Sequence, residues 1–117
     1  MADPNETVQR VALAAIGAQP DAKAVAAVGK LLATHENWAI RVLGAQALGR
    51  LGAAGAADAA RWLGDSAKAD PYALVREAAL KSLASFDARS ASAIAAQLAQ
   101  SDPEPRVRET AKSLVKK

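Results

Sequence analysis

Few side chains in this chain of 117 residues could act as metal ligands or catalytic bases. Its one histidine, His35, is followed by Glu36, and such a pair can offer a nitrogen and an oxygen to a transition metal. A protein metal site needs several ligands at a fixed geometry, and the chain has neither a second His nor a Cys. We therefore expect no metal, no cofactor and no thiol chemistry.

Serine hydroxyls are the remaining candidate nucleophiles, and each would need a base within hydrogen-bond reach. The seven serines are scattered over residues 66–113, with no His near any of them in sequence. The glycines at positions 49–55 follow no strand-like segment, so they do not form a phosphate-binding loop. We therefore expect a protein that is not an enzyme and look for its function in its surfaces.

One short pattern, an aliphatic residue that starts an apolar stripe, occurs four times along the chain. The copies begin at Val8, Ile40, Val75 and Val107, so the steps are 32, 35 and 32 residues. In each copy apolar or small residues recur four, seven and eight positions later, which is the period of one face of an α-helix. A fixed period of this length predicts stacked helical repeats that bury their apolar faces against one another.

Three further apolar-periodic segments lie between these helices, over residues 21–34, 55–63 or slightly beyond, and 88–100. Each follows a turn signal, and no segment alternates with the period of a strand. The sequence therefore predicts an all-α, right-handed α-α superhelix of about seven helices, three full repeats plus one helix. The three extra residues of the 35-residue step fall within 64–69, as a longer loop or an extended helix end. We expect a single domain over residues 1–117, either complete or part of a longer array.

Residues 40–52 resemble the second helix of a HEAT-like repeat, of the type found in phycobilisome-lyase-like proteins. The Asp-Pro turns at residues 70–71 and 102–103, each followed by a Val-Arg pair, resemble the same family. The resemblance covers nearly the whole chain and implies a HEAT-like solenoid in which turn aspartates and helix arginines form a ladder between repeats. Its members would be Asp70, Arg76, Asp102, Arg108 and Arg41.

Two positions depart from the family pattern. His35 stands where the second turn Asp is expected, and Gln9 replaces the first helix Arg. HEAT-like deoxyhypusine hydroxylases hold two irons with His-Glu pairs on several helices, whereas this chain has one such pair, in a turn. We therefore interpret His35 as a turn substitution rather than a metal ligand.

The chain carries a net charge of +3, and the excess of basic residues lies in its second half. Residues 104–117 alone supply it, and a basic end can contact nucleic acid or an acidic protein. Lysines at a helix C-terminus also favour the helix dipole, which is the interpretation we prefer. The absence of Cys, of an apolar run long enough to span a membrane and of a signal-like N-terminus favours a cytoplasmic protein without membrane contact.

The surface opposite the buried stripe of the four helices is the expected binding face. In the second repeat Trp38 and Val42 lie one turn apart on this face, with charges of both signs around them. An exposed Trp beside an aliphatic residue is typical of an interface anchor, although Trp38 could instead cover the seam between repeats. Trp62 aligns with exposed positions, and we favour a packing role for it. The predicted partner-binding residues are Trp38, Val42, Arg10, Gln46, Glu77 and Lys81.

These observations predict a non-catalytic module that binds a protein partner through the concave face of a helical solenoid. One alternative is an accessory or regulatory domain of a larger, lyase-like enzyme. Another is a solenoid that binds nucleic acid through its basic end. Leu114 and Val115 lack an obvious covering helix, so either a longer array or self-association would cover them.

Overall fold

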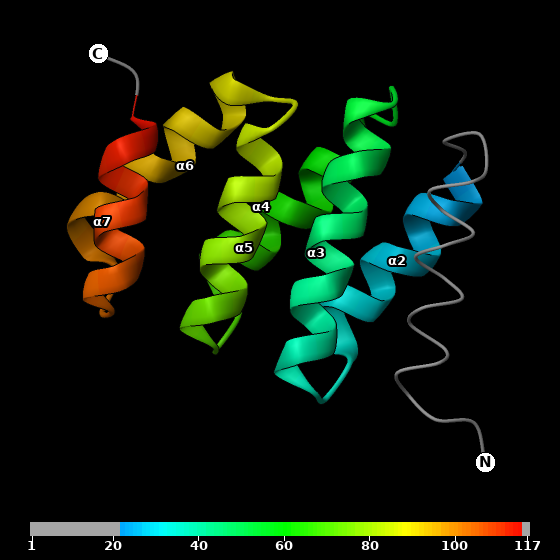
Figure 1. Cartoon of the computed structure of the whole chain (residues 1–117), viewed down its shortest axis with the longest axis horizontal. Coiled ribbons are helices and arrows are strands. Elements are labelled where there is room, and N and C mark those ends of the chain that lie inside the picture. Colours follow the sequence, from blue (N-terminus) through cyan, green and yellow to red (C-terminus); the bar gives the residue numbers. More distant parts are fainter. Residues whose placement is uncertain (1–21, 116–117) are drawn as a thin grey trace.

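The computed structural model describes residues 22–115, and they form helices joined by short turns (Figure 1). The prediction of an all-α fold is confirmed for this part of the chain, which contains no strand. The predicted helix that begins near Val8 lies outside the described residues. The described helices are α2 (Ala22–Thr34), α3 (Trp38–Ala53), α4 (Ala59–Ala69), α5 (Ala73–Ala84), α6 (Ala88–Ser101) and α7 (Pro105–Leu114).

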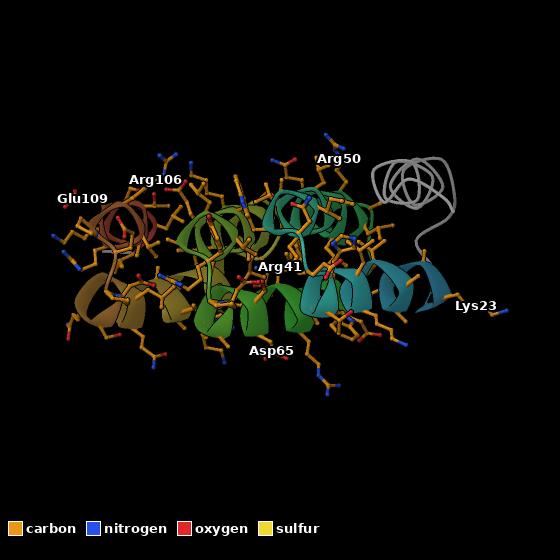
Figure 2. The ribbon with its side chains drawn as sticks, turned by 90° about the horizontal axis from the view of Figure 1, so that it is seen from below. Lys23, Arg41, Arg50, Asp65, Arg106 and Glu109 are labelled. Atoms are coloured by element: carbon orange, nitrogen blue, oxygen red, sulfur yellow. The ribbon has the colours of Figure 1, made fainter. Side chains whose placement is uncertain are left out.

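The helices are arranged in two layers. Helices α3, α5 and α7 lie side by side and form what we call the front layer, and α2, α4 and α6 form the back layer (Figures 1 and 2). Helices α3 and α5 each contact the back helices that precede and follow them in the chain, and α7 contacts α6. This is the arrangement expected of stacked two-helix repeats, whose apolar faces meet between the layers.

The core between the layers consists mostly of Leu, Val and Ala. Leu48, Leu63, Leu80 and Leu83 are fully buried, and alanines of both layers fill the space between them. The expected stripe of α3, at residues 44, 47 and 48, is buried throughout. Leu114 and Val115, which we expected to lack cover, are half-buried against the core.

Two glycines let aromatic rings lie directly on a helix backbone. A Cβ atom on Gly29 of α2 would collide with the Trp62 ring of α4, and a Cβ on Gly52 of α3 would collide with the Phe86 ring. Trp62 therefore packs on α2, in keeping with the interpretation we favoured. Because Gly29 has no side chain, the Trp62 ring lies directly on the backbone of α2 and fills the seam between α2 and α4.

The three extra residues of the second repeat lengthen α4. This helix runs six residues past Leu63, to Ala69, whereas α2 and α6 run three residues past Leu31 and Leu98. Of the two alternatives for the insertion, the structure has the extended helix end. Because the extension is helical, it adds no loop to the surface, and the turn at Asp70 still reaches the front layer.

Candidate functional site

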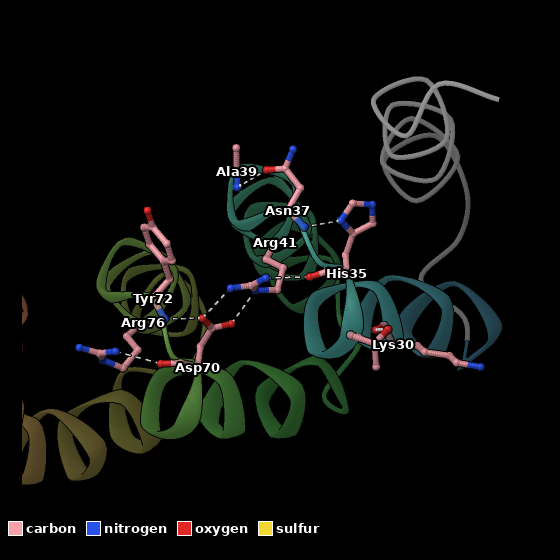
Figure 3. Close-up of polar contacts among 9 residues, drawn as sticks. Lys30, His35, Asn37, Ala39, Arg41, Asp70, Tyr72 and Arg76 are labelled. Carbon is pink, nitrogen blue, oxygen red and sulfur yellow. Dashed lines mark hydrogen bonds and ion pairs between the residues drawn. The ribbon is translucent and has the colours of Figure 1, made fainter. Parts of the chain in front are cut away.

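The turn aspartates and helix arginines form ion pairs between neighbouring repeats. Figure 3 shows the Arg41–Asp70 pair. Arg41 of α3 donates from Nε and Nη2 to the two carboxylate oxygens of Asp70, at 2.9 and 3.1 Å. Arg76 of α5 makes the same two-pronged contact with Asp102, at 2.8 and 2.9 Å. Each arginine thus grips the turn that precedes the next front helix, so the carboxylate partner of Arg76 is Asp102 and not Asp70.

Each ladder arginine also holds the turn of its own repeat. The Nη1 groups of Arg41 and Arg76 donate to the carbonyls of His35 and Asp70, six residues earlier, at 2.7 and 2.9 Å. Arg108 donates in the same way to the carbonyl of Asp102, at 2.7 Å. Arg108 departs from the expected pattern, because it has no carboxylate partner among the described residues.

His35 replaces one of the two functions of a turn aspartate. The Oδ1 atoms of Asp70 and Asp102 each accept a hydrogen bond from the backbone N–H two residues later, at 2.9 Å. In the earlier turn the His35 Nδ1 atom accepts the equivalent bond from the Asn37 N–H, at 3.0 Å. Gln9, which lies outside the described residues, precedes His35 by the 26 positions that separate Arg76 from Asp102. The sequence therefore has neither the Arg nor the Asp of the ladder at these two positions.

The ladder carboxylates are structural anions. Burial alone would raise the pKa of Asp102, but the hydrogen bonds from Arg76 and the Glu104 N–H outweigh it, together with the charges of Arg76 and Arg108. The net pKa of Asp102 is therefore lower than that of an ordinary Asp. Asp102 is only 4% exposed, so its carboxylate is not offered to a ligand.

A groove of about 660 Å³ lies on the front layer between α3 and α5. Its floor includes Val42, Leu74 and Ala78, which are all half-buried. A smaller hollow on the back layer, of about 380 Å³, lies beside Trp62. Arg10 lies outside the described residues. The other predicted partner-binding residues all line the front groove, and they are Trp38, Val42, Gln46, Glu77 and Lys81.

Trp38 lines one end of the groove and stacks on Tyr72, which is not among the predicted binding residues. The indole of Trp38 stacks on the ring of Tyr72, with centroids 5.0 Å apart and planes 8° from parallel. Trp38 is the first residue of α3 and Tyr72 immediately precedes α5, so the stack joins the starts of two front helices. Tyr72 is 45% exposed and Trp38 is half-buried, so Trp38 both covers the seam and lines the groove.

The expectation that Glu77 lies free on the binding face is wrong. Glu77 is 6% exposed, because Arg106 and Thr110 of the next repeat reach over to it. Arg106 Nε donates to both carboxylate oxygens at 3.0 and 3.1 Å, and the Thr110 hydroxyl donates at 2.8 Å. Burial would raise the pKa of Glu77, but these hydrogen bonds and the charges of Lys81 and Arg106 hold it below its ordinary value.

The same repeat positions are polar in one seam and apolar in the other. We take the aliphatic residue before each ladder arginine as position zero. The contact of Glu77 with Arg106 and Thr110 then joins position +2 of one front helix to positions −1 and +3 of the next front helix. On a helical wheel of one repeat, position +2 lies opposite the buried stripe and positions −1 and +3 lie to its sides, which is why the residues at −1 were missed. The polar set is Glu77, Arg106 and Thr110, and the apolar set is Val42, Leu74 and Ala78.

Within the described residues, no three His, Asp or Glu side chains lie close enough together to hold a metal ion. None of the described helices combines the length and the apolar character needed to cross a membrane. Asp87 caps the start of α6, where its carboxylate accepts hydrogen bonds from the backbone N–H and the hydroxyl of Ser90. The titratable groups described so far hold turns and seams together.

Comparisons with known proteins identify the family of the repeats. A family model described as HEAT repeats matches residues 1–84. No curated protein and no solved structure matches the chain. Helices α6 and α7 lie beyond the matched residues, yet Asp102 and Arg108 continue the ladder there.

Proposed function

Because the chain belongs to the HEAT-repeat family, we propose that it is a protein-binding module whose groove between α3 and α5 receives a segment of a partner protein. HEAT-type arrays stack their repeats into extended surfaces that commonly bind other proteins. The observation that carries the proposal is the groove itself, in which Trp38, Val42 and Leu74 offer apolar surface to solvent on the front layer.

The neighbouring seam shows why this groove is distinctive. Between α5 and α7 the +2 position is the ion-paired Glu77, which Arg106 and Thr110 hold within the protein. Between α3 and α5 the +2 position is Val42, and its neighbours Leu74 and Ala78 make no ion pair or hydrogen bond through their side chains. Apolar surface gains free energy when a partner covers it, so the α3/α5 seam is the favourable place for a partner to bind.

We propose binding rather than catalysis as the activity of this chain. Asp70, Asp102 and Glu77 are buried or half-buried acids held by arginines, and such a group cannot act as a general base without breaking the seam it stabilises. His35 uses Nδ1 to accept a backbone hydrogen bond in a turn. The groove, in contrast, contains the aromatic and aliphatic side chains in which interface energy concentrates.

The test compares affinity capture by the wild-type chain with capture by groove variants in an extract of the source cells. Trp38→Ala removes the aromatic end of the groove, and Val42→Asp places a charge on its floor. We expect each variant to weaken a specific partner at least about tenfold, which corresponds to about 1.4 kcal/mol.

Arg61→Glu is the matched control, because Arg61 is exposed on α4 in the opposite layer. This variant should retain the partner at wild-type affinity. Thermal melting of each variant, followed by circular dichroism, shows whether binding is lost because a contact is removed or because the protein no longer folds. Retention of the partner by folded Trp38→Ala and Val42→Asp, or its loss in Arg61→Glu, would contradict the proposal.

A further inference from the structure

The charged groups around the α3/α5 groove are unequally available to a partner. Three cations line it, Arg50, Lys81 and Arg106, against one anion, Glu77. The Glu77 side chain is 9% exposed, whereas those of Lys81 and Arg106 are 60% and 63% exposed. The negative charge is thus buried and neutralised within the seam, and the surface that an incoming segment meets is basic.

The cations also have hydrogen-bonding capacity left. Arg106 uses Nε for Glu77, while its two terminal nitrogens have no partner among the described residues. Arg50 lies in the last turn of α3 and projects from the front layer, away from the back layer, as does Arg106 (Figure 2). A guanidinium with a free edge binds a carboxylate through two parallel hydrogen bonds, so these residues suit carboxylates.

The groove is polarised along its length. The Trp38–Tyr72 stack lies at the starts of α3 and α5, and Arg50 and Lys81 lie in their last turns. The third lining cation, Arg106, is the second residue of α7 and pairs with Glu77 instead. The end of the groove with Arg50 and Lys81 therefore favours carboxylates, and the end with Trp38 favours an apolar side chain. Val42 provides an apolar surface between the two ends.

We propose that the occupant of this groove is an acidic amphipathic segment of a partner protein, with a large apolar residue at the Trp38–Tyr72 end and carboxylates toward Arg50 and Lys81. The inference rests on the proposed function and names the chemistry of the partner. Helix α3 has 16 residues, so a helical segment matching the groove would have about 16 residues, near 24 Å at 1.5 Å per residue.

Single-stranded nucleic acid is also anionic and stacks on aromatic rings, but the groove suits it less well. Trp38 and Tyr72 stack on each other, so their facing surfaces are occupied. The floor at Val42, Leu74 and Ala78 is aliphatic, which favours an apolar side chain over a sugar-phosphate backbone. Three lining cations are also fewer than the roughly six to ten phosphate contacts of a typical nucleic-acid site.

The experiment is selection of a random peptide library on the intact chain, followed by counter-selection on Val42→Asp to isolate the peptides that need the groove. We expect these peptides to be acidic, with an apolar residue at one end. Their affinity should fall about tenfold in the double variant Arg50→Glu/Lys81→Gln, decline with rising salt, and stay unchanged in Arg61→Glu. Replacing the carboxylates of a selected peptide by amides should have the same effect as the double variant.

The outcomes distinguish this inference from the proposed function. Groove-dependent peptides that are neutral or basic, or whose affinity the double variant changes less than about twofold, would overturn the acidic partner and leave the groove as a protein-binding site. Peptides that bind Val42→Asp as well as wild type, or a selection without groove-dependent peptides, would count against both. Oligodeoxythymidylate binding that is tighter than the best peptide and lost in Val42→Asp would assign the groove to nucleic acid and reject the inference.

Discussion

The Arg76–Asp102 pair shows how single residues hold the repeats in register. The guanidinium makes two bonds to the carboxylate of the next turn and one to the carbonyl of its own turn, Asp70. The Arg76 and Asp102 side chains are 10% and 2% exposed, so removing one partner leaves a buried charge unpaired. Among the described residues Arg108 bonds only to a carbonyl. It therefore serves as an internal reference for how much the carboxylate contact adds to stability.

Arg76→Ala should lower the free energy of unfolding by about 3 kcal/mol, because it leaves the buried Asp102 carboxylate without its cation. Arg108→Ala should cost about 1 kcal/mol, the value of a single hydrogen bond to a carbonyl. Urea unfolding followed by circular dichroism measures both. Equal losses in the two variants would show that the carboxylate contact adds nothing.

Stability should fall in acid, because Glu77 and Asp102 both have folded-state pKa values below their ordinary ones. A carboxyl of this kind stabilises fully above the pKa of the unfolded chain, about 4, and the contribution is lost as the pH falls through the folded-state value. Urea unfolding between about pH 7 and pH 3 measures the slope. Glu77→Gln should flatten part of the slope below about pH 4.5, whereas Glu109→Gln, at a side chain 74% exposed, should not. An unchanged slope in Glu77→Gln would refute this role for Glu77.

At the scale of helices, an aromatic ring or a second helix approaches a helix closely where that helix carries a glycine. Gly29 lies under the Trp62 ring, and Gly49 brings α3 so close to α5 that a Cβ there would lie 3.0 Å from the Ser82 Cβ. Helix propensity alone favours Ala over Gly by about 1 kcal/mol within a helix. Close packing therefore explains why Gly occupies these positions. Packing favours Gly there, whereas helix propensity favours Ala.

Gly29→Ala should destabilise the wild-type chain by about 1 kcal/mol or more, because the new methyl group overlaps the Trp62 ring. In a Trp62→Ala background the overlap is absent, so the same substitution should stabilise by about 0.5–1 kcal/mol through helix propensity. Thermal or urea unfolding of the four proteins tests this reversal of sign. Stabilisation by Gly29→Ala in both backgrounds would show that Trp62 does not depend on the glycine.

The helices could be predicted from the sequence, whereas the contacts across the front layer could not. The stripe that begins at Ile40 marks the buried face of α3, and the Asp-Pro turns mark where the front helices begin. The partnership of Glu77 with Arg106 and the stack of Trp38 on Tyr72 depend on the offset between neighbouring helices. That offset comes from packing between repeats, and no periodicity within one helix reports it.

At the scale of the whole molecule, contacts between the layers hold the repeats together, whereas the outward side of the front layer varies from repeat to repeat. Ion pairs and apolar packing between the layers fix each repeat on its neighbour, and among the described helices contacts join only nearest repeats. The outward side of the front layer then differs from seam to seam within the described residues. The α5/α7 seam is joined by Glu77 and Arg106, and the α3/α5 seam is open and apolar at Val42.

The most direct measurement of where this protein binds is site-specific photo-crosslinking in the source cells. A photoreactive residue in place of Gln46 lies in the α3/α5 groove, and one in place of Arg61 lies on the opposite layer. Both positions are exposed, so their general reactivity is comparable. We expect a discrete crosslinked protein from position 46 that Val42→Asp abolishes, and none from position 61. A discrete partner crosslinked from position 61 alone, or equally from both positions, would contradict this expectation.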